Sequence, residues 1–185
     1  MLTLKPMGAV AIALSISVLT YGQGNSFTRI KYNGGSVPST VKKDDWGNTL
    51  TVTSDEITLK LKDGKIEKID PKRVTGLSYG QEAHRRVGTM IALAVLLAPL
   101  ALFGLFHKTR LHYIGIEYST PDDKKGGVLL QADKGNYKGV LMALRGVTGA
   151  AVAVSTEERK YVPTGIETIT PAEPNKDKPK EKEKK

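Results

Sequence analysis

The segment Val87–Phe106 (VGTMIALAVLLAPLALFGLF) carries no charged residue across 20 consecutive positions. As an α-helix it would be about 30 Å long, which matches the hydrocarbon core of a bilayer. Burial inside a soluble domain is the alternative, but a helix this long with no polar face needs more apolar cover than a small domain offers. The sequence therefore predicts that this segment attaches the chain to a membrane.

Pro99 favours a hairpin over a single span, because proline removes a backbone donor and kinks or ends a helix. The arms Gly88–Ala98 and Leu100–Phe106 would be about 16 Å and about 10 Å long and would not cross the core. Backbone groups near the turn would need cover, which oligomerisation of hairpins could supply. A single transmembrane span remains the alternative. The side chains expected to insert are Val87, Met90, Ile91, Leu93, Val95, Leu96, Leu97, Pro99, Leu100, Leu102, Phe103, Leu105 and Phe106.

Basic residues flank the apolar segment on both sides: Arg85 and Arg86 before it, Lys108 and Arg110 after it. Cationic side chains near a membrane surface are attracted to anionic headgroups by about 1 kcal/mol each. We therefore expect these four side chains to contact headgroups. Balanced flanks also give no charge asymmetry that would orient a single span, which again favours the hairpin.

Residues 1–24 have the pattern of a secretory signal peptide. Lys5 precedes an apolar stretch, Met7–Leu19, and Thr20 and Gly22 suit the positions before a cleavage site. An uncleaved N-terminal anchor is the alternative. The expected location is the envelope of a bacterial-type cell, on the periplasmic or outer face of the inner membrane.

The 185-residue chain has a net charge of +9 and a pI of about 9.6. Such a balance can indicate nucleic-acid binding, but the sequence has no nucleic-acid-binding motif and no basic face with interspersed aromatic residues. Membrane lipids are the better match. The chain has no cysteine, which excludes disulfides, thiolate catalysis and a lipid-modified N-terminal cysteine.

Short alternating segments on either side of the apolar insertion predict β-strands. Residues 25–86 are expected to form the first half of a domain and residues 107–154 the second half. Ile57, Leu59 and Leu61 repeat with period 2 after a turn at residues 54–55, and Asp63-Gly64 predicts a type I′ turn.

A helix is predicted from Tyr137, where Val140, Leu141 and Leu144 follow at i+3, i+4 and i+7. Asp133 is the expected N-cap and Gly146 the expected C-cap. Residues 155–185, rich in Pro, Lys and Glu, have the composition of a disordered tail.

About six short strands followed by one helix resemble the pleckstrin-homology-like (PH-like) barrel or roll, in particular bacterial PH and GRAM-type domains. The resemblance is carried by LTVTSDEITLKLKDGKIEKI, RVTGLSYG, HYIGIEY, GVLLQAD and NYKGVLMALRG. It implies a mainly β domain with a C-terminal helix (α+β) that binds lipid headgroups or a protein partner and catalyses nothing. A single membrane crossing would put the two halves on opposite sides, where their strands could not pair. The alternative to the hairpin is therefore a single-pass subunit of an envelope assembly.

No residue constellation predicts an enzyme, a cofactor or a metal site. The histidines His84, His107 and His112 flank the apolar segment without metal-ligand spacing and are expected to be interfacial polar residues. The carboxylate pairs Asp44-Asp45 and Asp122-Asp123 fall in predicted turns, where solvated loop residues are more common than catalytic dyads. The predicted partners are membrane lipids and an envelope protein or a second copy of the chain.

Overall fold

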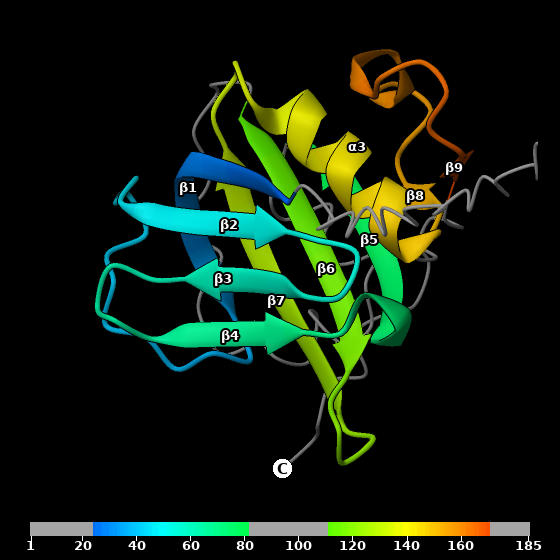
Figure 1. Ribbon diagram of the computed structural model, residues 1–185. Coiled ribbons are helices and arrows are strands. Elements are labelled where there is room, and N and C mark those ends of the chain that lie inside the picture. Colours follow the sequence, from blue (N-terminus) through cyan, green and yellow to red (C-terminus); the bar gives the residue numbers. More distant parts are fainter. Residues whose placement is uncertain (1–23, 82–110, 171–185) are drawn as a thin grey trace, which may run out of the picture.

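The computed structural model describes residues 24–81 and 111–170. Within them, nine strands form one mixed sheet with the order β4-β3-β2-β1-β7-β6-β5-β8-β9, accompanied by one α-helix (Figure 1). The strands are β1 (Asn25–Gly35), β2 (Asn48–Val52), β3 (Ile57–Lys60), β4 (Ile66–Ile69), β5 (Val74–Gly80), β6 (His112–Ser119), β7 (Lys125–Ala132), β8 (Val152–Ala153) and β9 (Thr168–Ile169). The helices are α3 (Tyr137–Thr148) and two 3₁₀ turns, η1 (Pro71–Arg73) and η3 (Arg159–Tyr161). The predicted mainly β fold is confirmed, and α3 follows the first seven strands as expected, although the short strands β8 and β9 come after it.

The first four strands form an antiparallel meander. The predicted hairpin around residues 54–55 is present, with Leu50 opposite Leu59 in β2 and β3. The predicted type I′ turn at Asp63-Gly64 is wrong: Gly64 has φ +87°, whereas Asp63 is not among the residues with positive φ. The loop holds three residues, because the Leu61 N–H donates to Lys65 O, and such loops need only one left-handed residue.

Strands from the two sides of the insertion pair with each other. Leu77 of β5 lies opposite Ile116 of β6, and Ile114 of β6 lies opposite Leu130 of β7. Strand β7 returns to β1, which also pairs with β2, so β1 joins the two halves of the sheet. Figure 1 shows β2, β3 and β4 in front of β6 and β7, with α3 beside them. The sheet therefore curls into a roll whose inner face holds the core.

Helix α3 buries the predicted stripe of Tyr137, Val140, Leu141 and Leu144. Its caps differ from the prediction. The N-cap is Asn136, and Asp133 instead shapes the preceding turn, its carboxylate accepting from the Gly135 N–H at 2.9 Å.

The C-cap is Gly149 (φ +68°), one turn beyond the predicted Gly146. Val147 packs against the core, so extending the helix past Gly146 buries a further apolar side chain.

Residues 155–170, assigned by composition to the tail, carry η3 and β9. Strand β8 runs parallel to β5, and β9 runs parallel to β8. Each has two residues, too few to produce a detectable alternation. In the described ranges, no helix has the length and apolar character needed to cross a membrane. The segment predicted to attach the chain to a membrane, residues 87–106, lies outside them.

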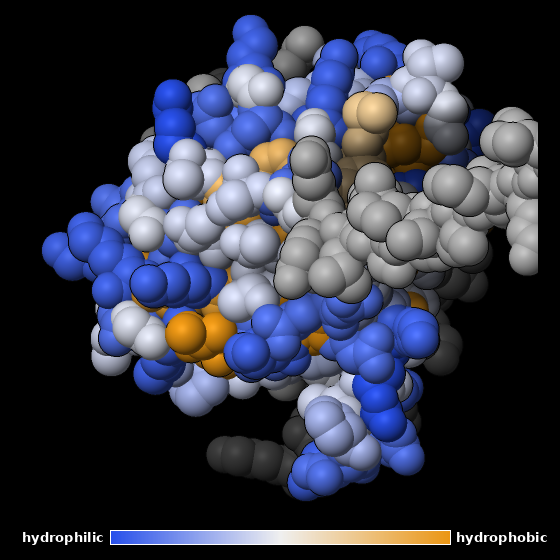
Figure 2. All heavy atoms as spheres, viewed as in Figure 1, coloured by the Kyte–Doolittle hydropathy of each residue, from blue (hydrophilic) through white to orange (hydrophobic). Residues whose placement is uncertain are grey.

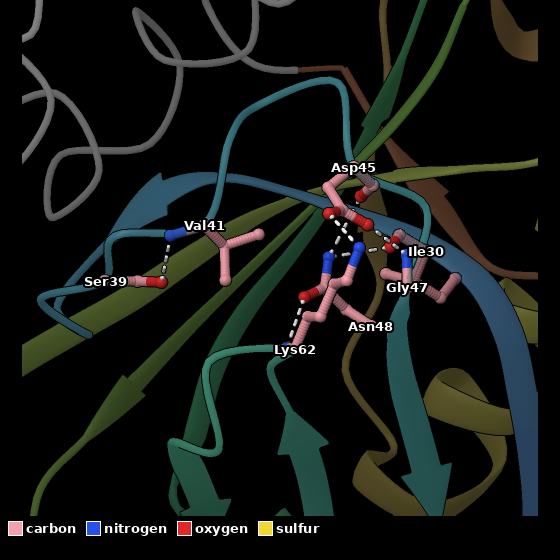
Figure 3. A network of polar contacts seen from close by, with 7 residues as sticks. All are labelled: Ile30, Ser39, Val41, Asp45, Gly47, Asn48 and Lys62. Carbon is pink, nitrogen blue, oxygen red and sulfur yellow. Dashed lines mark hydrogen bonds and ion pairs between the residues drawn. The ribbon is translucent and has the colours of Figure 1, made fainter.

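The loop of residues 36–47 is held to the roll by Asn48, whose side chain is 1% exposed. Its Nδ2 donates to Ile30 O at 2.9 Å and Asp45 O at 3.2 Å, and its Oδ1 accepts from the Lys62 N–H at 3.1 Å (Figure 3). Around it, Asp45 accepts from the Gly47 N–H and from Lys62 Nζ. The hydrogen bond from Lys62 holds the pKa of Asp45 below its usual value. One buried amide thus joins β1, the loop and the β3–β4 turn.

Candidate functional site

The residues predicted to insert into a membrane and those predicted to contact headgroups all lie between positions 82 and 110, outside the described residues. The same holds for the predicted signal peptide and for residues 171–185. Two features within the described residues bear on function. One is the end of the sheet where residues 82–110 leave and return. The other is a groove at the seam of the roll, the place where β4 approaches the end of β6.

The insertion begins and ends at neighbouring positions of the sheet. Gly80, near the end of β5, pairs with Tyr113, near the start of β6. Paired residues of antiparallel strands have Cα atoms about 5 Å apart. Residues 82–110 therefore leave the described domain from Gln81 and return to it at Leu111 on the same end of the sheet.

A buried carboxylate holds the departing strand. Glu158 is 7% exposed, and its Oε1 accepts from the Gln81 N–H at 2.6 Å while its Oε2 accepts from Ser155 Oγ at 2.8 Å. Hydrogen bonds to a buried carboxylate are stronger than neutral ones because they compensate its lost hydration. Glu158 thus ties the segment after β8 to the last described residue before the insertion.

An aromatic stack supports the returning strand. His112 lies 3.7 Å from Tyr137 between ring centroids, with the planes 5° apart, and a hydrogen bond of 2.8 Å joins His112 Nδ1 to Tyr79 Oη. Burial lowers the pKa of His112, which favours the neutral form of the ring. The prediction that His112 is an interfacial polar residue is wrong, since its side chain packs in the roll against α3.

The groove lies where β4 approaches the end of β6 and has a volume of about 280 Å³. Tyr118 Oη donates to Glu67 Oε1 at 2.6 Å across it, and burial raises the pKa of Tyr118 far above its usual value. Acidic side chains outnumber basic ones four to two in its lining, which comprises Asp55, Glu56, Glu67, Lys68, Ile69, Asp70, Arg73, Tyr118, Ser119, Thr120 and Pro121. Such a lining suits a cationic group and repels an anionic headgroup.

The carboxylate pairs expected in loops take part in local contacts. Asp45 belongs to the Asn48 network, and Asp123 lies 3.2 Å from Arg73. Across the ranges 24–81 and 111–170, no group of three or more His, Cys, Asp or Glu side chains could hold a metal ion.

Sequence reasoning missed Glu158 and the stack around His112. Glu158 follows Glu157 in a stretch whose composition resembles a solvated tail, so no local signal marks it as buried. Tyr137 was predicted as a core residue of α3, but its partner His112 lies 25 positions earlier on another element. Only the fold brings these side chains together.

The chain matches no family model and no curated protein. Among solved structures, it is similar to a chain in the structure of the Spt16D Pob3N heterodimer, with 10% identity and a TM-score of 0.40. The match covers 72% of this chain and 57% of that chain. Similarity of this size carries no conclusion about function.

Proposed function

We propose that this protein is a non-enzymatic, membrane-attached binding module of the cell envelope, with a PH-like roll carried on an apolar hairpin. Residues 87–106 form the attachment, and Arg85, Arg86, Lys108 and Arg110 contact anionic headgroups. The roll contacts a partner protein. The observation that carries this proposal is the pairing of Gly80 with Tyr113, which puts both ends of the insertion at one place.

The pairing supports a hairpin over a single span. A segment that crosses the bilayer once ends on the opposite side, about 30 Å from where it began. Strands β5 and β6 form six paired positions and so lie together. The alternative, a single-pass subunit with half a domain on each side, would require this ladder to be absent.

The PH-like assignment is supported by the order of elements, in which seven antiparallel strands precede α3 and the sheet curls around one core. We propose different places for the two expected ligand classes, and the acidic lining of the groove supports this division. Anionic headgroups suit the basic flanks of the insertion, whereas the groove suits a cationic segment of a protein partner.

Labelling from one side of a sealed vesicle tests the hairpin. The chain has no cysteine, so Ser54→Cys and Asp122→Cys, both in exposed turns, each provide one thiol. An impermeant maleimide should label both variants from the same side of inside-out or right-side-out vesicles. Labelling from opposite sides would establish the single span and refute the hairpin.

Flotation with liposomes tests the headgroup contacts. Changing Arg85, Arg86, Lys108 and Arg110 to Gln should weaken retention on anionic vesicles by about 4 kcal/mol at low ionic strength, with less effect at high salt. A matched control changes four exposed lysines of the roll instead: Lys43, Lys60, Lys68 and Lys124. Equal loss in the two variants would show that charge alone, and not its position beside the insertion, drives binding.

A further inference from the structure

The outer face of the strands that flank the insertion has an unusual composition. Residues facing outward alternate with the core residues Leu77, Tyr79, Ile114, Ile116, Val128 and Leu130, which point inward. The outward set is Ser78, Gly80, Tyr113, Gly115, Leu129 and Gln131, named here the outer platform. It contains no charged residue itself, and the charged residues Glu117 of β6 and Lys31 of β1 border it.

The register aligns these residues in two rows across three strands. Gly80, Tyr113 and Gln131 form one row, and Ser78, Gly115 and Leu129 form the other. The second row continues to Gly34 of β1. Leu129 therefore lies among residues with little or no side chain, and the backbone there is open to close approach by another segment.

The platform is buried, although its two large apolar residues do not belong to the hydrophobic core. Tyr113 is 2% exposed and Leu129 is 0% exposed, yet neither is part of the core cluster. Ser78 is also 0% exposed, and its Oγ has no hydrogen-bond partner among the described residues.

The outward face of the other strands is different. On β2, β3 and β4, the outward positions hold Thr49, Thr51, Thr58, Lys60, Ile66 and Lys68, all of them half-buried or exposed. Figure 2 shows mainly hydrophilic residues over this side of the molecule, with a small hydrophobic area. The low polarity of the outer platform is therefore a local property of β5, β6 and β7.

We infer that the outer platform is the docking site of the chain's own apolar segment, residues 87–106. The segment leaves the sheet after Gly80 and returns just before Tyr113, so both of its ends start at one row of the platform. Five residues (82–86) and four residues (107–110) separate it from the described strands. At about 3.3 Å per extended residue, these linkers span about 16 Å and about 13 Å, enough to fold back over the face.

From residue 76 to residue 80 and across β5, β6, β7 and β1, the outer face of the sheet measures about 13 Å by about 14 Å, and it includes the charged residues Glu117 and Lys31 at its margins. The two arms divided by Pro99 are about 16 Å and about 10 Å long as helices.

Docking on the platform also accounts for the lack of a polar side on the segment, because one side would contact the sheet and the other lipid. This lipid-facing half of the inference rests on the membrane attachment proposed above, whereas docking on the sheet does not.

Disulfide trapping in the Cys-free full-length chain tests the docking. Ser78→Cys is nearly isosteric, and it is combined in turn with Ala92→Cys, Ala94→Cys, Ala98→Cys and Ala101→Cys. Because thiols bridge only when their Cα atoms are within about 7 Å, at least one pair should give an intramolecular disulfide, identified by peptide mass. The matched control is Thr51→Cys, outward-facing on β2, which should give at least tenfold less product with the same partners.

Other occupants give other products, and each overturns the inference. A disulfide between Ser78→Cys and Ala11→Cys would assign the platform to the N-terminal apolar stretch, and disulfide-linked dimers would assign it to a second copy. Absence of any disulfide across the four partners would exclude the segment. Flotation on vesicles, measured on the same variants, tests membrane attachment independently. Protein that forms the disulfide but does not float refutes membrane attachment and leaves the docking intact. Protein that floats but forms no disulfide refutes the docking and leaves membrane attachment intact.

Discussion

Removing the Asn48 side chain tests whether one buried amide holds the loop of residues 36–47 to the roll. Asn48→Ala deletes three hydrogen bonds, to Ile30 O, Asp45 O and the Lys62 N–H. Each contributes about 1 kcal/mol net, so the free energy of unfolding should fall by about 3 kcal/mol. In a chain whose total stability is about 5–15 kcal/mol, that is a large fraction.

The assay is urea unfolding of the full-length protein in lipid nanodiscs, followed by far-UV circular dichroism and by tryptophan fluorescence. Trp46 is the chain's only tryptophan and lies in the loop that Asn48 holds, so fluorescence reports on the loop directly. If the loop is part of the cooperative unit, the two transitions should coincide and the slope m should be unchanged.

Asn33→Ala is the matched control, since Asn33 is 3% exposed and its Nδ2 has no hydrogen-bond partner in the part of the chain that the structure describes. Its loss of stability should be less than half that of Asn48→Ala, because fewer hydrogen bonds are removed. Equal losses in the two variants, or a loss below about 1 kcal/mol for Asn48→Ala, would refute the role assigned to the amide.

Three further predictions concern the seam, the helix end and the buried histidine. A double-mutant cycle of Tyr118→Phe and Glu67→Gln should give a coupling free energy of about 1–2 kcal/mol, since the bond across the seam is charge-assisted; additive losses would show that it contributes nothing. Gly149→Ala should destabilise the domain by about 1 kcal/mol, because the backbone at Gly149 has φ +68°. Gly146→Ala inside α3 should stabilise it by up to about 1 kcal/mol, because alanine has the higher helix propensity. The denaturation midpoints of the two variants should therefore move in opposite directions. Burial lowers the pKa of His112 in the folded state, so the stabilisation from the neutral ring is fully present above the unfolded pKa near 6.5 and is lost as the pH falls below it. His112→Gln should therefore make the free energy of unfolding fall less steeply between pH 7 and pH 5. An unchanged pH dependence would contradict the burial of a neutral histidine.

Local patterns in the sequence predicted most of the first seven strands and the buried face of α3. They succeed because period 2 and period 3.6 are set by the backbone itself. Caps and turns were less predictable. Asp133 is a good N-cap by type, yet it forms the turn before the helix, and the choice between Gly146 and Gly149 depended on whether Val147 found a core to contact. The positions of the helix ends therefore depend on tertiary packing, which local sequence patterns do not contain.

The parts of the site that the sequence could not predict all depend on distant partners. Glu158 is buried because it receives the Gln81 N–H, 77 positions away. Leu129 belongs to the apolar run 128–130, which does not alternate and is typical of a strand buried on both faces, whereas the alternation of β6 predicts that Tyr113 faces solvent. Neither strand alone indicates what covers this face. The two-residue strands β8 and β9 likewise exist only because β5 offers an edge.

The position of β1 between β2 and β7 has a consequence for synthesis of the chain. Lys31 of β1 pairs with Gln131 of β7, which is synthesised 100 residues later. Until then, this edge of β1 has no strand to pair with. At a translation rate of about 5–20 residues per second, that edge stays open for about 5–20 s. Open strand edges are sites of aggregation, and non-local pairing slows folding. Substitutions that weaken the early β2–β4 hairpins should therefore reduce the yield of folded protein more than they reduce the stability of the finished domain.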